Sequence, residues 1–412
     1  GDTTDDSGVL CNAAIASGAH KLILTGTCRF TETCTIQSDD LRIDSTGAYI
    51  DASEMYGSDV KNSPDAVFHI LGSASGSTTL SASAVKYSTS LTVTNGALLT
   101  SGEPIYIVSD GELWYTESGS AIYIQMINVI KSINGNQIEL QEPLDFSFDA
   151  VSHNVSIESW ATVKNISIDH GVVFGGNYRR NIPNGVGIGF VYAEYFSNLS
   201  VTGSLIDGFE NTAIRGQKGV GLTTEIGAIR GHATDYAAPI VEDVNSGFYG
   251  VFAVTVNNFL MSNVTGYRVR HVQDAAKGTK GVVSNVTGVD CHRPALGCHS
   301  GTHSIRYSNV ESSGGSGGLQ WRGFDLSVDG IKIRCPDGAS SGIYDSQGTT
   351  LDKPSRRIIL NADIVAARNA IKISGTASDI IIDNSNLVGG IESGYHAVDI
   401  ATNYVESVLI SS

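Results

Sequence analysis

The sequence predicts an all-β fold in which short strands stack into a solenoid, and its composition and an internal repeat carry this prediction. The 412 residues include 47 Gly and only 17% charged residues, in long alternations of Val, Ile, Ser, Thr and Asn. Such alternation is typical of strands, and little of the chain has the periodicity of an amphipathic helix. The repeat indicates that the strands belong to successive, similar coils.

The repeat is visible in two phases. In the first phase a Ser-Asn motif places Asn263, Asn285 and Asn309 at spacings of 22 and 24 residues, and residues 197–203 are an earlier copy. We interpret these asparagines as turn residues that hydrogen-bond in a ladder, because Asn tolerates tight bends. In the second phase a short alternating strand ends at a glycine, at intervals of 23, 22, 25 and 27 residues. These glycines are Gly278, Gly301, Gly323, Gly348 and Gly375.

A coil period of about 22–27 residues narrows the choice of solenoid. It is too short for a propeller blade, and the units lack the leucine framework and helix of a leucine-rich repeat. Stacked coils of parallel strands fit best, with neighbouring coils about 4.8 Å apart. Outward side chains one period apart then form columns along the solenoid.

The charge of the chain bears on its partners. The 26 Lys and Arg against 42 Asp and Glu give a formal net charge of −16, which opposes attraction to nucleic acid or to anionic membranes. No apolar run approaches the roughly 18 residues that a membrane-spanning helix needs. We therefore expect neither nucleic acid nor a membrane as a partner.

The cysteines match no zinc-binding spacing, so we expect no metal and no other cofactor. An even number permits disulfides, but buried thiols are the more common outcome in a chain of this length. The cysteines are Cys11, Cys28, Cys34, Cys291, Cys298 and Cys335.

The beginning of the chain resembles a known family. An acidic turn over residues 1–6 is followed by residues 12–15, 21–24 and 26–30, in the order found where the pectate-lyase-like superfamily of parallel β-helices begins. Further on, residues 102–108 and 129–144 are similar to a hairpin insertion that is common in bacteriophage tailspikes. Together with the coils, this resemblance covers nearly the whole chain.

The resemblance implies a right-handed parallel β-helix with a short N-terminal capping helix, and a homotrimer. It also implies a tailspike-type depolymerase, part of the virion tail and acting outside the cell, that binds and cleaves a bacterial surface polysaccharide: capsule, exopolysaccharide or O-antigen. We divide the chain accordingly into residues 1–63, the N-terminal cap and first coils; residues 64–150, a β-rich hairpin insertion; and residues 151–412, the main β-helix with the glycan-binding surface.

Candidate catalytic carboxylates come from the chemistry of glycoside hydrolysis, which uses a pair of Asp or Glu side chains. Asp274 is the first candidate, because its small neighbours leave room for a sugar. Glu242 is the favoured partner on the preceding coil. Asp345 is the other candidate partner, although three coils at strand spacing put it about 14 Å away. This pairing predicts a glycoside hydrolase, and the resemblance to tailspike depolymerases implies that it is endo-acting.

Two alternatives remain open. His299 and Arg322 belong to a cluster of His and Arg that favours a polysaccharide lyase, in which a base removes a proton beside a uronate carboxylate and Arg neutralises that carboxylate. A non-catalytic glycan-binding adhesin is the other alternative. The expected substrate-binding residues are Trp321, Tyr344, Arg270, His271, His303, Lys277, Arg215 and Tyr236.

Overall fold

The computed structural model describes most of the chain. The described residues are 6–55, 65–117, 120–175, 188–209, 211–231, 249–336, 341–345, 355–374, 377–390, 394–401 and 407–411.

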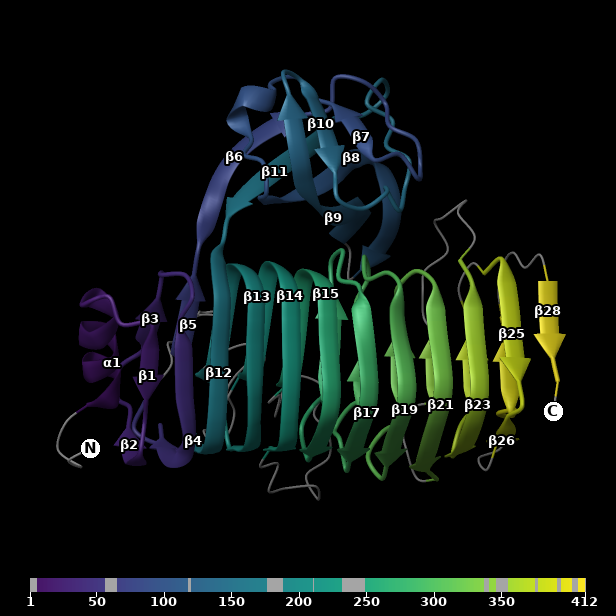
Figure 1. Cartoon of the computed structure of the whole chain (residues 1–412). Helices are drawn as coiled ribbons and strands as arrows, with labels where there is room; N and C mark the ends of the chain where they lie inside the picture. The colour runs from purple at the N-terminus through teal and green to yellow at the C-terminus, as the bar shows by residue number, and fades with distance from the viewer. Residues whose placement is uncertain are drawn as a thin grey trace.

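In these ranges the chain forms a parallel β-helix, as the sequence predicted (Figure 1). Twenty-two of the described strands join one continuous sheet, and each pairs in parallel with strands of the neighbouring coils. These strands are β1 (Lys21–Ile23), β2 (Gly26–Arg29), β3 (Cys34–Ile36), β4 (Arg42–Asp51), β5 (Ala66–Leu71), β12 (Val163–Phe174), β13 (Gly189–Asp207), β14 (Thr212–Arg230), β15 (Tyr249–Tyr267), β16 (Gln273–Ala276), β17 (Gly281–Val289), β18 (Leu296–Gly297), β19 (Ile305–Ser313), β20 (Leu319–Trp321), β21 (Leu326–Cys335), β22 (Ile343–Asp345), β23 (Arg357–Ala366), β24 (Ile371–Ile373), β25 (Asp379–Asp383), β26 (Asn386–Val388), β27 (Val398–Ile400) and β28 (Ser407–Ile410).

The interior of the coils is filled by the inward half of each alternating strand. Burial therefore alternates along strands such as β21 and β23. Aromatic side chains stack along the axis near the N-terminus, where the Phe68 ring lies 5.6 Å from both the Phe30 and Phe190 rings in edge-to-face contacts. Such contacts between coils bury apolar area that a single coil could not bury.

The long strands bend at residues with left-handed backbone angles, and most of these residues are Asn. Asn263, Asn285 and Asn309 have φ of 55°, 52° and 50°. The Asn285 amide donates to the Asn263 side chain at 3.2 Å. The predicted turn ladder is therefore present, since Asn adopts this conformation at lower cost than most residues.

The earlier copy of the repeat belongs to a different ladder, which corrects the single phase expected from the sequence. Asn198 donates to Asn165 at 3.1 Å. The register of β13, β14 and β15 then places Asn198 opposite Gly221, and Gly221 opposite Asn258. The shared Ser-Asn motif therefore marks a bend, but it does not fix which corner of the coil bends.

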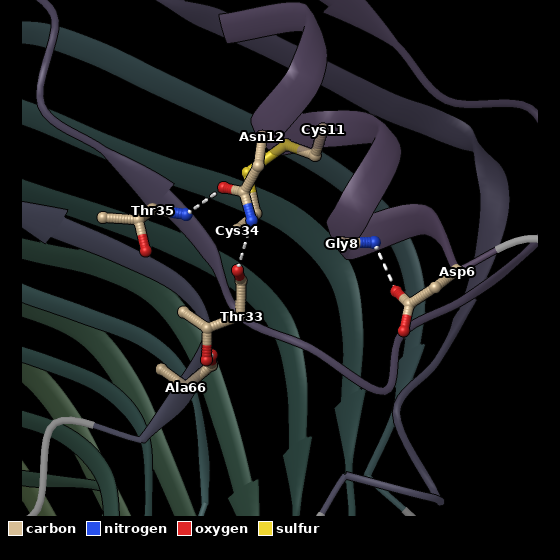
Figure 2. Close-up of a disulfide and its surroundings, with 8 residues drawn as sticks. All are labelled: Asp6, Gly8, Cys11, Asn12, Thr33, Cys34, Thr35 and Ala66. Carbon is tan, nitrogen blue, oxygen red and sulfur yellow. Dashed lines mark hydrogen bonds between the residues drawn. A yellow bond between two sulfur atoms is a disulfide. The ribbon is translucent and has the colours of Figure 1, made fainter. Parts of the chain in front are cut away.

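The helix α1 (Ser7–Ala16) lies against the first coils, at the N-terminal end of the solenoid (Figure 1). Asp6 caps it by accepting the Gly8 N–H at 2.7 Å. Figure 2 shows a disulfide between Cys11 and Cys34 that joins α1 to β3, beside the Asn12 amide, which bonds the backbone on both sides of Cys34. The expectation of buried thiols is therefore wrong for this pair.

The other cysteines follow the expectation. Cys28, Cys291, Cys298 and Cys335 are free and buried. No helix in the described part of the chain is long and apolar enough to span a membrane.

A second, antiparallel sheet rises from the coils near β5 and arches toward β15 (Figure 1). Its strand order is β6-β11-β8-β9-β10-β7, and it encloses its own apolar core. It extends from Ser73 to Ala161, so both expected bounds of the insertion are corrected. Residues 66–71, expected in the insertion, form β5 of the solenoid, and residues 155–161, expected in the main β-helix, form β11 of the second sheet. Its elements are β6 (Ser73–Thr79), β7 (Ser90–Thr92), the 3-10 helix η1 (Gly96–Leu98), β8 (Pro104–Glu117), β9 (Ser120–Asn134), β10 (Gln137–Leu140) and β11 (Val155–Ala161).

Candidate active site

One outward column runs along the face formed by the first residues of β13, β14 and β15 and by β16, β18, β20, β22, β24 and β27. Strand register aligns its members from coil to coil, so neighbouring side chains are about one strand spacing apart. The members are Tyr192, Arg215, Phe252, Asp274, Gly297, Gln320, Tyr344, Lys372 and Asp399. Strand register thus places the predicted residues Arg215, Asp274 and Tyr344 in one column, in which Arg215 and Asp274 are buried.

Gly297 opens a pocket in this column. Gly297 lies between Asp274 and Gln320 in the column, and it is the member of the column that has no side chain. A Cβ atom at Gly297 would lie 3.0 Å from Asp274 Oδ1 and 3.1 Å from His271 Nδ1. The pocket has a volume of about 160 Å³. It is lined by Arg270, His271, Asp274, Arg293, Gly297, Cys298, His299, Gln320 and Arg322.

Asp274 is the buried anion of the pocket. Its side chain is 1% exposed; Oδ1 accepts the Ala275 N–H at 2.9 Å, and Oδ2 lies 3.2 Å from His299 Nε2. Burial alone would raise the pKa of Asp274, but His299, His271 and the Ala275 N–H outweigh it and lower the pKa below its usual value. Asp274 is therefore a carboxylate at neutral pH.

His299 connects this carboxylate to a guanidinium. Arg322 Nη1 lies 3.4 Å from His299 Nδ1. Because a guanidinium can only donate, this contact makes Nδ1 the acceptor and leaves the hydrogen on Nε2, facing Asp274. The imidazole is 37% exposed, so its Nδ1 edge is within reach of a ligand.

His271 lies deeper in the pocket and is held neutral. Its Nδ1 is 2.6 Å from the Pro294 carbonyl oxygen, which can only accept, so Nδ1 carries the hydrogen. Burial lowers the pKa of His271 to about 4, against the opposing charge of Asp274. Its ring stacks on Tyr249 at 5.6 Å, which fixes the orientation of the imidazole.

Arginines gather around this pocket although the chain as a whole is acidic. Arg270 stacks over the Tyr249 ring at 5.5 Å, and Arg293 and Arg322 complete a group of three guanidinium side chains along the lining. Cys298 lies among them, and burial raises the pKa of its thiol well above the usual range. A neutral thiol is a weak nucleophile, so the sulfur packs rather than reacts.

Aromatic side chains continue the column on the N-terminal side of the pocket. The Arg215 guanidinium lies between the rings of Tyr192 and Phe252, at 5.5 and 5.6 Å. Phe252 also lies 5.4 Å from the Tyr249 ring, nearly parallel to it. Arg215 is thus held in place by two rings beside the pocket.

Two of the predicted residues point into the solenoid, which corrects their assigned roles. Asp345 is fully buried, and its Oδ2 accepts from Arg357 Nε at 2.5 Å. Trp321 is fully buried and packs against Tyr307 at 6.1 Å. In both cases the neighbouring residue, Tyr344 or Gln320, takes the outward position, because successive side chains of a strand face opposite ways.

His303 lies away from the pocket, where it joins the insertion to the coils. Its buried ring packs edge-to-face against Phe146 at 5.4 Å, and Phe146 also packs against Phe324 at 5.6 Å. Beside it, Lys280 Nζ lies 2.6 Å from Glu142 Oε2. His303 therefore stabilises the joint between the two parts, and its expected role as a substrate contact is wrong.

The remaining predicted residues are spread more widely. Lys277 is exposed at the end of β16, and Tyr344 lies two register positions along the column from Gly297. Glu242 and Tyr236 lie outside the described residues, so their predicted roles stay predictions. The structure thus brings together Asp274, His299, Arg322, His271 and Arg270 at one pocket.

Three residues at or beside the pocket were not expected from the sequence: Gly297, Arg293 and Phe252. The coil period could have placed Phe252 and Gly297 beside Asp274, because residues 252, 274 and 297 are about one period apart and are aligned by strand register. In the described part of the chain, no three His, Cys, Asp or Glu side chains are grouped so that they could hold a metal ion.

No protein-family model and no curated protein matches this chain. Among solved structures it is similar to the Gp54 tailspike of Acinetobacter baumannii bacteriophage AP22 in complex with A. baumannii capsular saccharide. The two share 14% identity over 98% of this chain and 67% of that chain, with a TM-score of 0.57. It is also similar to the Pseudomonas phage phi297 tailspike gp61, at 12% identity over 94% and 74% of the two chains and a TM-score of 0.39. The Streptococcus pneumoniae surface protein and adhesin PfbA is 10% identical over 99% and 97%, with a TM-score of 0.43. The similarity to Gp54 confirms that this chain has the parallel β-helix fold of a phage tailspike.

Proposed function

We propose that the chain is a tailspike-type depolymerase that binds and cleaves an acidic bacterial surface polysaccharide at the pocket around Asp274 and His299. The observation that carries the proposal is the contact of a buried carboxylate with a half-exposed imidazole, inside a ring of arginines. In this proposal the protein acts outside the cell as part of a phage tail, as a homotrimer. Sedimentation as a monomer at micromolar concentration would contradict the trimer.

The arginines favour an acidic sugar as the ligand. A chain with a net charge of −16 repels a polyanion at long range, and three guanidinium groups at one pocket reverse that repulsion locally. Arg binds carboxylates through two parallel hydrogen bonds, which orients the sugar as well as holding it. A uronate unit matches this lining better than a neutral sugar.

Among the described residues that line the pocket, Asp274 is the single carboxylate, and this favours β-elimination over hydrolysis. Hydrolysis uses a second carboxyl group as a general acid with a raised pKa, whereas the pKa of Asp274 is lowered. His299, with Nε2 beside Asp274 and Nδ1 as a hydrogen-bond acceptor, is suited to act as a base.

The proposed elimination starts when Arg322 turns from His299 to the uronate carboxylate. His299 Nδ1 takes the proton from C5, the electron pair of the C5–H bond becomes the C4=C5 double bond, and the C4–O4 bond breaks. The imidazolium, stabilised by Asp274, then returns its proton to the departing O4. The products are a new hydroxyl end and an unsaturated uronate, with no water consumed.

Glycoside hydrolysis remains the second candidate function, because Asp274 is an ionised carboxylate in a sugar-sized pocket. In that mechanism Asp274 acts with Glu242 as expected from the sequence. A glycan-binding adhesin without cleavage is the non-enzymatic candidate.

One experiment separates these functions. The protein is incubated with a panel of purified acidic capsules and O-antigens, and released fragments are weighed by mass spectrometry. Fragments with the mass of whole repeats and an unsaturated uronate support elimination; fragments one water heavier support hydrolysis and contradict it. Binding without release, by the parent protein and an Asp274→Asn variant alike, supports the adhesin.

A further inference from the structure

A second groove lies on the outside of the solenoid, away from the candidate active site. It follows the corner where the long strands β17, β19, β21 and β23 bend, whereas the active-site pocket lies on the face of the short strands β16, β18 and β20. The long strands and their bends face the viewer in Figure 1. The groove has a volume of about 420 Å³. It is lined by Asn285, Thr287, Asn309, Val310, Glu311, Gly330, Ile331, Lys332, Asn361 and Asp363.

The groove coincides with a missing rung in the asparagine ladder. Strand register places Asn309, Gly330, Asn361 and Asn384 at the same bend of successive coils. All four have left-handed φ angles, from 47° to 73°. Gly330 is the member without a side chain, so the amides of Asn309 and Asn361 are separated by two coils.

The groups around the missing rung are positioned for an amide. Asn309 Oδ1 faces the gap, 3.0 Å from where a Cβ atom on Gly330 would lie. On the far side, Asn361 uses one amide hydrogen for Asp329 Oδ1 at 2.6 Å, and its Oδ1 accepts from Asn384 at 2.5 Å. Asn361 keeps a second amide hydrogen that can donate to a ligand, and Asn309 Oδ1 can accept from one.

The charge of the groove differs from that of the active site. Lys332 Nζ lies 3.0 Å from Glu311 Oε1, and Asp363 is paired with Arg334. The Asp329 carboxylate, which accepts from Asn361, adds one negative charge, so these groups carry no excess of positive charge, in contrast to the three arginines around Asp274. The groove therefore favours a neutral, hydroxyl-rich ligand over a uronate.

We propose that this groove is a second, non-catalytic saccharide site, which binds a neutral N-acetylamino sugar by taking its acetamido group into the gap at Gly330. An acetamido group has the same planar amide as an Asn side chain. Its N–H donates to Asn309 Oδ1, its carbonyl accepts from Asn361, and the sugar hydroxyls contact Lys332 and Glu311. The proposal does not depend on the chemistry at Asp274.

The test measures binding of disaccharides of N-acetylglucosamine, N-acetylgalactosamine and N-acetylmannosamine by saturation-transfer NMR and calorimetry, with cellobiose as the amide-free control. At least one acetamido disaccharide is expected to bind, with saturation of its acetyl methyl group, at least tenfold more tightly than cellobiose. If none of the three binds, the proposal is wrong.

A substitution then locates the site. Gly330→Asn places an amide side chain in the gap. Asn309, Asn361 and Asn384 already adopt the left-handed φ of this bend, so Asn is compatible with the backbone there. Because the new amide occupies the proposed site, the variant should bind at least tenfold more weakly. Gly221→Asn is the matched control. Gly221 has the same φ of 73° as Gly330 and lies opposite Asn198 of the preceding coil, but it does not line the groove. Thermal unfolding checks that both variants fold. Equal binding by the parent and Gly330→Asn, or equal loss in both variants, would overturn the proposal.

Discussion

The Nε2 atom of His299 lies 3.2 Å from Oδ2 of Asp274, a carboxylate that is almost completely buried at the floor of an arginine-lined pocket. An imidazole held by a carboxylate on one nitrogen keeps its other nitrogen unprotonated and available to a ligand. A buried carboxylate also stabilises the imidazolium that forms when this nitrogen takes a proton. The pair therefore has the arrangement of a base and the group that orients it.

Asp274→Asn should lower kcat by at least about 100-fold, because the amide keeps the shape of the carboxylate but does not stabilise an imidazolium. The rate of fragment release from a cleaved polysaccharide measures this loss. Asp399→Asn is the matched control, since Asp399 lies in the same outward column, beyond Lys372, and it should leave kcat unchanged. Equal rates in the parent and Asp274→Asn would remove Asp274 from the mechanism.

Arg293→Ala should raise KM for an acidic polysaccharide about tenfold and change kcat little, because Arg293 is an exposed member of the pocket lining that attracts the ligand. Charge-assisted hydrogen bonds contribute on the order of 1.5–3 kcal/mol each, less when they are exposed. The effect should shrink as salt is added. An unchanged KM at low salt would show that the substrate carboxylate is bound elsewhere.

The repeat alone was sufficient to predict the solenoid, because a period near 23 residues leaves few architectures that could bury so many alternating strands. Asp274, His299 and Arg322 could be grouped from the same repeat, because they follow one another at about the coil period. The period does not explain the disulfide, because Cys11 lies in the helix α1 and only Cys34 lies in a coil strand.

Two side-chain directions were predicted wrongly, because a shift of one residue along a strand reverses the face on which a side chain lies. Asp345 and Trp321 are each adjacent to an outward residue, and a shift of one position exchanges the core face for the solvent face. Nothing in the local sequence of Asp345 shows that Arg357, on the next coil, neutralises it inside the core. Gly297 was missed because an empty column position has no chemical signal until its neighbours are known.

Acid should destabilise the fold between about pH 6.5 and pH 4. Burial lowers the pKa of His170, His271 and His303 to about 4 each, from about 6.5 in the unfolded chain. In this window the unfolded chain binds protons that the folded chain does not, so stability falls as pH decreases, by on the order of 3 kcal/mol for each group. Denaturant unfolding at pH 7 and pH 4.5 measures the loss. His303→Phe should flatten the dependence, and a midpoint that does not change with pH would contradict the prediction.

Phe146→Ala should weaken the joint between the insertion and the coils. Phe146 packs against both His303 and Phe324, and truncation of a buried Phe costs about 3–5 kcal/mol. The loosened insertion should become sensitive to limited proteolysis while the coils stay resistant. Val85→Ala is the control, because Val85 is 69% exposed on the same insertion. Equal protection of the parent and Phe146→Ala would show that other contacts hold the insertion in place.

Loss of the Cys11–Cys34 disulfide should destabilise the N-terminal end of the solenoid, where it ties α1 to β3 (Figure 2). Closing a loop of 23 residues stabilises a fold by about 3 kcal/mol, mostly by restricting the unfolded chain. The double variant Cys11→Ser, Cys34→Ser should therefore unfold at a lower temperature than the oxidised parent. Reductant should lower the unfolding temperature of the parent to that of the double variant and leave the variant unchanged, because the remaining cysteines are buried thiols. If reductant leaves the parent unchanged, while mass spectrometry shows that the bond has been reduced, then α1 is held by the Asn12 hydrogen bonds and its apolar contacts rather than by the disulfide.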